Sequence, residues 1–363
     1  MKNLLSLFGR IKPAPLRYGL LGLITLAGLL LLFLVSIYAG AWGKLPSKEA
    51  LSNFRYQRAS EVYTADSVLI GKYYLFDRQP IGYSELAPPL IKSLIAIEDE
   101  RFYRHSGIDY PSLLRVAFKT ILLQEQSAGG GSTLTQQLAK NLYPRKERKK
   151  TNLVVDKVKE MFIAKRLEEQ FSKEDIIMHY LNTVSFGDNT FGVESASLRF
   201  FDKHASQLKI EEAATLVGML KATYTYNPRL FPKNSLARRN LVLQSMENND
   251  FISTAEMDSL KTLPLVIDYK EFDYNSGVAP YFREEVRKQM IRWSDEQSEK
   301  GKNYNIYTDG LKIYTTLNHK MQLMAEAAMK VHMKSLQKQF EAGYGKNAPW
   351  NRKRILERAV HNT

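Results

Sequence analysis

The hydrophobic pattern of the chain begins with one long uninterrupted stretch. Between residues 18 and 42 no side chain is charged, and Leu, Ile and Ala predominate. A run of this length is long enough to cross a hydrocarbon core of about 30 Å as a helix. We therefore predict a transmembrane helix over 18–42, with Tyr18, Tyr38 and Trp42 at the membrane interfaces.

A cleaved signal peptide is the alternative to an uncleaved anchor. Residues 39–41 (Ala-Gly-Ala) resemble a cleavage site, but a signal sequence has an apolar core of only about 7–15 residues. The longer run favours the anchor. Residues 1–17 carry four basic side chains and no acidic one, which places them in the cytoplasm and the rest of the chain outside.

After short β-branched and aromatic runs at 61–64 and 68–76, helical periodicity takes over. From 91 to 246, apolar residues recur every three or four positions in most segments, which is typical of helices with one buried face. We predict helices over 91–101, 111–124, 153–171, 172–183, 210–221 and 235–246. Segments 280–291 and 321–340 also favour helix, and 311–317 alternates like a strand. The expected fold is mainly α, with a small α+β region near the C-terminus.

Length and composition narrow the class of protein. The 363 residues are too many for one ordinary core, so two or three units are expected. The chain has no cysteine, and its six histidines lack metal-binding spacing, which argues against disulfides, thiolate nucleophiles and a histidine metal cage. The net charge of +14 favours polyanions or an anionic membrane surface. Because most of the chain is expected outside the cytoplasm, nucleic acid is not an expected partner.

The first candidate for chemistry is a pair of carboxylates, Glu98 and Asp99, at the end of the predicted helix 91–101. A carboxylate that closes an apolar helix lies in a low dielectric and near the negative end of the helix dipole. Both effects favour its neutral form, which is how a carboxylate becomes a general acid or base near neutral pH. Taken alone, an exposed helix end explains the pair equally well.

The second candidate is the segment 128–143, AGGGSTLTQQLAKNLY. Its glycines let the backbone approach a ligand, and Thr133 followed by Gln136 fits a capping box at a helix start. The free N–H groups of that start favour an anion. Thr133, Gln137 and Lys140 share one polar face, with Asn141 beside them. A solvated face is the ordinary meaning of such a pattern, and no Gly-Lys-Ser/Thr follows that would make a P-loop.

The third candidate is the pair Lys157 and Glu160, three residues apart on the predicted helix 153–171. A surface ion pair of this kind contributes well under about 1 kcal/mol. The functional alternative places a second carboxylate, with its cation, in the same cleft as Glu98. The preferred interpretation of the basic run 144–150 is a solvated loop. The alternative is a surface that faces a membrane or a lipid-linked anion.

These segments together resemble one family, the peptidoglycan glycosyltransferase (transglycosylase) domain of class A penicillin-binding proteins. Glu98-Asp99, Phe102, His105 and Gly107 match its first motif. Residues 130–141 (GGSTLTQQLAKN) match the second almost letter for letter, and 157–160 match the third. Tyr180-Leu181-Asn182 with Gly187 resembles the fourth motif, and 212–228 the fifth. The likeness covers about 60–246.

The resemblance implies a domain organisation. A lysozyme-like, mainly α glycosyltransferase domain would occupy 60–250, after a cytoplasmic tail (1–17) and the transmembrane helix (18–42). Residues 251–363 would form a linker that leads towards a transpeptidase domain. Because the Lys-Thr-Gly of that domain does not occur, we expect the chain to end before it. The protein would lie in the bacterial cytoplasmic (inner) membrane as a single-pass protein.

The resemblance also implies a reaction. Lipid II would be polymerised into β-1,4 glycan strands with inversion and release of undecaprenyl diphosphate. Glu98 would act as general base, and Glu160 would assist at the leaving group, with a divalent cation such as Mg²⁺ or Mn²⁺ where one is needed. No metal ligand is assigned. Partners would be lipid II, the growing glycan strand, the membrane and other cell-wall synthesis proteins. The residues implied in substrate binding are Asp99, Phe102, His105, Ser132, Thr133, Gln137, Lys140, Asn141 and Lys157.

Within this set, Asp99 and His105 are expected to shape the first motif rather than react. One departure is Asp156, because the family often has arginine just before the lysine of the third motif. The alternative enzyme is a lysozyme-like lytic enzyme, which would use one glutamic acid to cut glycan and would not need a lysine-rich diphosphate site. A non-catalytic scaffold is the third alternative, and the presence of Glu98 and of residues 130–133 argues against it.

Overall fold

A computed structural model describes residues 14–54, 56–122, 130–145, 153–270, 277–345 and 348. Of the basic run 144–150, only residues 144 and 145 are described, and residues 146–150 lie outside the described residues. The chain divides into two compact units, one of Met1–Gln57 with Phe76–Lys270 and the other of Arg58–Leu75 with Glu271–Thr363. The first unit carries all the candidate site residues.

The predicted membrane helix is present as α2, Ala14–Tyr38. Its Tyr18–Tyr38 segment is long and apolar enough to cross a membrane, judged by length and composition. The helix ends at Tyr38, four residues before the predicted end at Trp42. Gly40 and Gly43 have positive φ angles of 87° and 102°, a conformation that leaves the helix and that glycine adopts without a Cβ clash.

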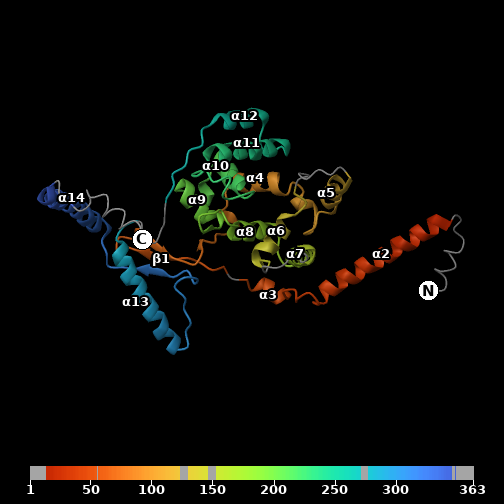
Figure 1. The fold of residues 1–363 in the computed structure, drawn as a ribbon, viewed down its shortest axis with the longest axis horizontal. Helices are drawn as coiled ribbons and strands as arrows, with labels where there is room; N and C mark the ends of the chain where they lie inside the picture. The colour runs from red at the N-terminus through yellow and green to blue at the C-terminus, as the bar shows by residue number, and fades with distance from the viewer. Residues whose placement is uncertain are drawn as a thin grey trace. The chain divides into compact units, whose positions relative to one another are not determined.

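The first unit is built from helices around one core (Figure 1). Helix α4 packs against α10 and α11, and α6 packs against α7 and α8. Two short strands, β3 (Asp77–Arg78) and β4 (Thr190–Phe191), pair in parallel. The helices are α3 (Lys48–Ser52), α4 (Pro88–Glu98), α5 (Tyr110–Leu122), α6 (Leu134–Leu142), α7 (Leu153–Glu168), α8 (Lys173–Thr183), α9 (Val193–Phe201), α10 (Ile210–Met219), α11 (Pro232–Asn248) and α12 (Thr254–Thr262). The prediction of a mainly α fold is confirmed.

The predicted helices of this unit are all found, with shifted ends. The predicted helix 91–101 begins at Pro88 and ends at Glu98. Pro88 and Pro89 occupy the first turn, where a missing N–H costs nothing. Asp99 has φ −160° and ψ 73°, so the backbone leaves the helix directly after Glu98. The candidate base is therefore the last residue of the helix.

The second unit is a small α+β unit. Strand β1 (Ser60–Tyr63) lies between β2 (Leu69–Tyr73), antiparallel to it, and β5 (Lys312–Tyr314), parallel to it. Helix α13 (Pro280–Glu299) contributes Val286 to the core of this sheet, and α14 (His319–Tyr344) follows β5. The core residues are Val62, Ile70, Tyr73, Val286, Ile306 and Ile313. The predicted strand at 311–317 is thus present but shorter, and the β-branched runs at 61–64 and 68–76 contain β1 and β2.

The boundaries of the units differ from the predicted domain at 60–250. Residues 58–75 belong to the second unit, because β1 pairs with both β2 and β5 and the three strands share one core. Residues 251–270 belong to the first unit instead of a linker. Ile252 and Met257 explain this, since both are buried in the helical core. The assignment of a function to each unit stays a prediction.

Candidate active site

Glu98 is held at the end of α4 by a side chain from α6. Its Oε2 accepts a hydrogen bond of 2.9 Å from Nε2 of Gln137. Oε1 of Gln137 in turn accepts a hydrogen bond of 3.0 Å from the hydroxyl of Tyr180 on α8. Glu98 is half-buried, so its carboxylate has a protein donor on one side and access from outside on the other.

Asp99 joins two helices of the site. The backbone N–H of Leu134 donates to its Oδ2 at 2.9 Å, and Nε2 of His105 lies 3.0 Å from its Oδ1. The carboxylate therefore occupies the first turn of α6, where an anion is favoured. We predicted a substrate anion at this helix start, and the structure places the protein's own Asp99 there. Asp99 and His105 thus contact each other within the first motif, and the expectation that they shape it rather than react stays a prediction.

Thr133 caps α6 as predicted, and its hydroxyl is used within the protein. Oγ1 accepts from the N–H of Gln136 at 3.2 Å and donates to the carbonyl of Gly107 at 2.7 Å. The side chain of Gln136 also points to Gly107, at 3.5 Å, and does not return to the backbone of Thr133 as a capping box requires. With 2% exposure, Thr133 supports the loop from inside.

Phe102 lies in the core and not on a cavity wall. Its side chain is fully buried, and the ammonium group of Lys173 lies 4.3 Å from its ring centroid. An aromatic ring in this position stabilises the first motif through packing and a cation–π contact. The substrate contact that the resemblance implies for Phe102 does not fit this geometry.

Glu160 is a buried carboxylate between two cations. It is 4% exposed. Nε of Arg145 donates to its Oε1 at 2.8 Å, and Nζ of Lys157 donates to its Oε2 at 3.2 Å. Lys157 also donates to Oγ of Ser132 at 2.8 Å. The predicted pair of Lys157 and Glu160 is therefore present, within a network that a surface pair would not have.

Glu98 and Glu160 line one cavity of about 360 Å³, which we call the basic cavity. Five cationic side chains line it together with these two carboxylates. The cations are Lys140, Arg145, Lys157, Lys221 and Arg238. Ser132 and Gln137 complete its polar wall, whereas the exposed Asn141 is not part of it. Such a lining fits a ligand that carries more than one negative charge.

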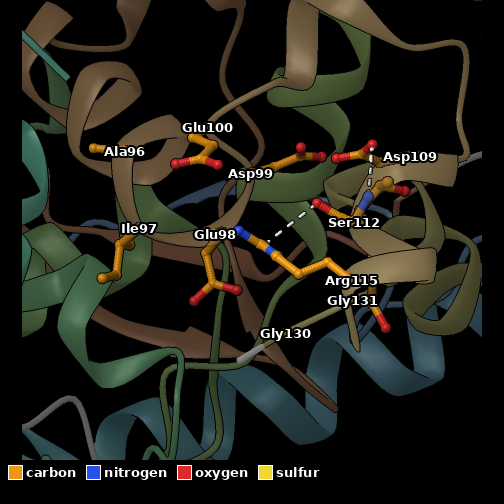
Figure 2. Close-up of a pocket in the computed structure, with 12 residues that line it drawn as sticks. Ala96, Ile97, Glu98, Asp99, Glu100, Asp109, Ser112, Arg115, Gly130 and Gly131 are labelled. Atoms are coloured by element: carbon orange, nitrogen blue, oxygen red, sulfur yellow. Dashed lines mark hydrogen bonds between the residues drawn. The ribbon is translucent and has the colours of Figure 1, made fainter. Parts of the chain in front are cut away.

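Glu98 also lines a second, smaller cavity of about 160 Å³ (Figure 2). We call it the acidic cavity, because four carboxylates line it, those of Glu98, Asp99, Glu100 and Asp109. Arg115 reaches into this view from α5, and its NH2 donates to Oγ of Ser112 at 3.4 Å. Residues 130–133 form the remaining wall. Glu98 thus lines both cavities.

The divalent cation that the resemblance implies has no cluster of ligands here. Among the residues that the structure describes, no group of three or more His, Asp and Glu side chains is placed to hold a metal ion. Glu160, the carboxylate nearest to that role, has both oxygens engaged by Arg145 and Lys157. We therefore derive no step through a metal.

Three cations of the basic cavity were not assigned from the sequence. Arg145 opens the basic run 144–150, and Lys221 and Arg238 stand near the ends of the predicted helices 210–221 and 235–246. Helix α7 has Asp156 where the family often has arginine. Arg145, from outside this helix, supplies a cation to Glu160 on α7. The available signal was the basic run itself, because helical spacing alone cannot show which distant helices face one cavity.

The site and fold define a class. A family described as Transglycosylase matches residues 66–247, about half of the chain, and the chain belongs to this family. Among individual proteins, it is 34% identical over 287 residues to penicillin-binding protein 1A of Escherichia coli (strain K12), which covers 79% of this chain and 32% of that protein. It is 34% identical over 325 residues to penicillin-binding protein 1A of Aquifex aeolicus (strain VF5), covering 88% and 42%. The chain thus spans roughly a third of the length of these relatives.

The solved structures include a relative as well. A 2.6 Å crystal structure of penicillin-binding protein 1A from Haemophilus influenzae is 26% identical, and the likeness covers 76% of this chain and 29% of that chain. Its TM-score is 0.42.

Proposed function

We propose that this chain is a membrane-anchored peptidoglycan glycosyltransferase that polymerises lipid II. One observation carries the proposal: Glu98 lines both the basic cavity and the acidic cavity. A transfer from a diphosphate-linked donor to a sugar hydroxyl needs a cationic pocket for the donor and a base beside the acceptor. Membership of the transglycosylase family supports this reaction class.

Glu98 is the general base in this proposal. The 4-hydroxyl of the acceptor sugar, seated in the acidic cavity, gives its proton to the Glu98 carboxylate. Its oxygen then forms a β-1,4 bond to the anomeric carbon of the donor while the bond from that carbon to the diphosphate oxygen breaks. The leaving group departs as undecaprenyl diphosphate, and the configuration at the anomeric carbon is inverted.

The basic cavity stabilises the leaving diphosphate. The charge of the diphosphate is fully developed only as its bond to the anomeric carbon breaks. Fixed cations therefore stabilise the transition state more than the bound substrate. Lys140, Lys157 and Ser132 bind the phosphates in this proposal, with Arg145, Lys221 and Arg238 as additional cations. Glu160 acts by holding Arg145 and Lys157 in position, which is the assistance at the leaving group that the family resemblance implies.

The proposed place of the protein follows from α2. We infer a single pass through the bacterial inner membrane, with the basic N-terminus in the cytoplasm and both cavities outside. A lipid-linked donor would then meet the enzyme at the membrane surface. The growing glycan strand is the second partner, and other cell-wall synthesis proteins are further candidates.

The experiment uses the purified chain with fluorescent lipid II in detergent. We expect the wild type to form long polymer and Glu98→Gln to form none, because the amide cannot accept the proton. Glu174→Gln is the matched control, since Glu174 is an exposed carboxylate on α8 outside both cavities. Polymer from Glu98→Gln at the wild-type rate would remove Glu98 as the base.

The same assay separates the lytic alternative. A lytic enzyme would shorten preformed glycan strands and leave lipid II unpolymerised. The five cations around the basic cavity favour transfer from a diphosphate donor instead, since hydrolysis of a neutral glycan does not require them.

A further inference from the structure

A chain of two hydrogen bonds connects the core to the candidate base. Tyr180 on α8 donates to Oε1 of Gln137 on α6 at 3.0 Å, and Nε2 of Gln137 donates to Oε2 of Glu98 on α4 at 2.9 Å. Three separate helices thus meet at one side-chain amide. Tyr180 is 1% exposed and Gln137 is half-buried, so water has little access to the hydrogen bond between them.

The direction of these bonds is fixed by Tyr180 and Glu98 together. Burial raises the pKa of the Tyr180 hydroxyl well above its usual range, and the nearby negative charge of Glu98 adds to this. The hydroxyl therefore keeps its proton and acts as a donor at any working pH. The Glu98 carboxylate can only accept, so the NH₂ group of Gln137 faces Glu98, and the Tyr180 hydroxyl donates to the amide oxygen on the other side. Both partners therefore hold the amide in this orientation.

We propose that Tyr180 is a positioning residue for glycosyl transfer, which acts by fixing the orientation of the Gln137 amide and through it the Glu98 carboxylate. The proposal rests on the proposed function above. It also changes the role of Gln137, which the family resemblance assigns to substrate binding. In this structure, both ends of its amide are engaged by the protein.

Loss of the tyrosine hydroxyl would free the amide to rotate. With its oxygen towards Glu98, Gln137 would repel the carboxylate and would no longer hold it. A carboxylate without its donor favours the protonated form and a wider range of rotamers. Both changes reduce the fraction of enzyme that can accept the hydroxyl proton, so kcat falls and the acid limb of its pH profile moves to higher pH.

Other charged groups also face Glu98, and each stays unchanged in the variants below. From the basic cavity these are Lys140, Arg145, Lys157, Glu160, Lys221 and Arg238. From the acidic cavity they are Asp99, Glu100, Asp109 and Arg115. Their combined effect sets the wild-type pH profile, so the proposal concerns only the difference between variants.

The experiment is a double-mutant cycle on the full chain, with kcat and KM for lipid II measured from pH 5 to 9. We expect Tyr180→Phe to lower kcat by about tenfold, which corresponds to the loss of one ordinary hydrogen bond. KM should stay nearly constant, and the acid limb should move to higher pH. In a Gln137→Ala background, Tyr180→Phe should have no further effect on kcat, because the group through which it acts is gone.

Tyr73→Phe is the matched control for folding. Tyr73 is buried in the second unit, and its hydroxyl donates to the carbonyl of Arg283. Both variants remove one buried hydrogen bond, so both should lower Tm slightly, and only Tyr180→Phe should change kcat and the pH profile.

Three outcomes would overturn the proposal. The first is a wild-type kcat and pH profile in Tyr180→Phe. The second is a full additional loss of kcat when Tyr180→Phe is placed on Gln137→Ala, which would show an effect independent of Gln137. The third is an equal loss of kcat in Tyr73→Phe. If the wild type itself forms no polymer, the proposed function fails, and the role of Tyr180 fails with it.

Discussion

At the scale of residues, the site depends on side chains that are buried next to partners from distant segments. Glu160 illustrates this, because a carboxylate at 4% exposure would be unfavourable without Arg145 and Lys157. Removing one partner from a buried pair costs more than the pair contributes when complete. The network is therefore better understood as an ordered set of charges than as a source of stability.

His179 is a half-buried titratable residue on α8, and its imidazole contacts the hydroxyl of Tyr56. Burial lowers the pKa of its imidazole below 6.5, although Asp175 opposes the shift. The folded state therefore binds fewer protons at His179 than the unfolded state near this pH. Its contribution to stability is present above about pH 6.5 and is lost as the pH falls through the folded pKa.

We therefore predict that the stability of the wild type decreases between pH 7.5 and 5.5, and that His179→Gln decreases less. Urea unfolding in detergent at the two pH values measures the difference. Groups that titrate elsewhere contribute equally to both proteins, so the difference in slope isolates His179. An equal decrease in both proteins would contradict the prediction.

The sequence predicts those parts of the site that depend on local spacing along one helix. Glu98 closes an apolar helix, and Lys157 and Glu160 are three residues apart, so both features follow from local spacing. Tyr180 and Arg145 were not predicted as site residues. The contact of Tyr180 with Gln137 spans 43 positions, and no local pattern reports on such a pairing.

At the scale of elements, the important feature is the junction between the end of α4 and the start of α6. The Asp99 carboxylate binds the N–H of Leu134 and faces His105, while Thr133 binds the carbonyl of Gly107. Helix periodicity predicted both helices and the cap at Thr133. It could not show that Asp99 would occupy the helix start, because that depends on the direction in which the chain leaves α4 after Glu98.

Asp99→Asn should weaken this junction. The amide keeps the shape of the carboxylate but loses the charge that favours the N–H of Leu134 and the His105 ring. We expect the free energy of unfolding to fall by about 1–3 kcal/mol, the cost of disturbing a buried charged hydrogen bond. We also expect kcat to fall, because Glu98 is the adjacent residue. Urea unfolding and the lipid II assay measure the two effects.

Glu100→Gln is the control for the change in the free energy of unfolding. Glu100 is an exposed neighbour, so its substitution makes the same chemical change, carboxylate to amide, without disturbing the buried contacts of Asp99. Unfolding free energies that match in Asp99→Asn and the wild type would show that the junction does not depend on the charge of Asp99.

At the scale of the whole molecule, two units are formed by a chain that crosses between them more than once. The second unit takes β1 and β2 from residues 58–75 and β5 from residues beyond 271, so neither segment completes the sheet alone. The alternating pattern at 311–317 predicted β5, and β-branched runs marked the positions of β1 and β2. They did not predict the partition, because the pairing of Val62 with Ile313 joins positions far apart in the chain.

Each unit has its own hydrophobic core, from which we predict separate loss of stability. Ile313 is 8% exposed and packs in the core of the second unit. Ile313→Ala should destabilise that unit by about 2–5 kcal/mol, the usual cost of this truncation in a core. In hydrogen exchange on the full chain, amides of β1, β2 and β5 should lose protection, and those of α4, α6 and α7 should keep theirs.

Val331→Ala on α14 is the control, because Val331 is 72% exposed and its truncation removes little buried surface. Under the proposed function, Ile313→Ala should also polymerise lipid II at nearly the wild-type rate, since both cavities are lined by residues of the first unit. Equal loss of protection in α4 and β1 would instead mean that the two units unfold as one cooperative body. In that case a change in the second unit would act on the arrangement around Glu98 through global stability, despite the separate cores.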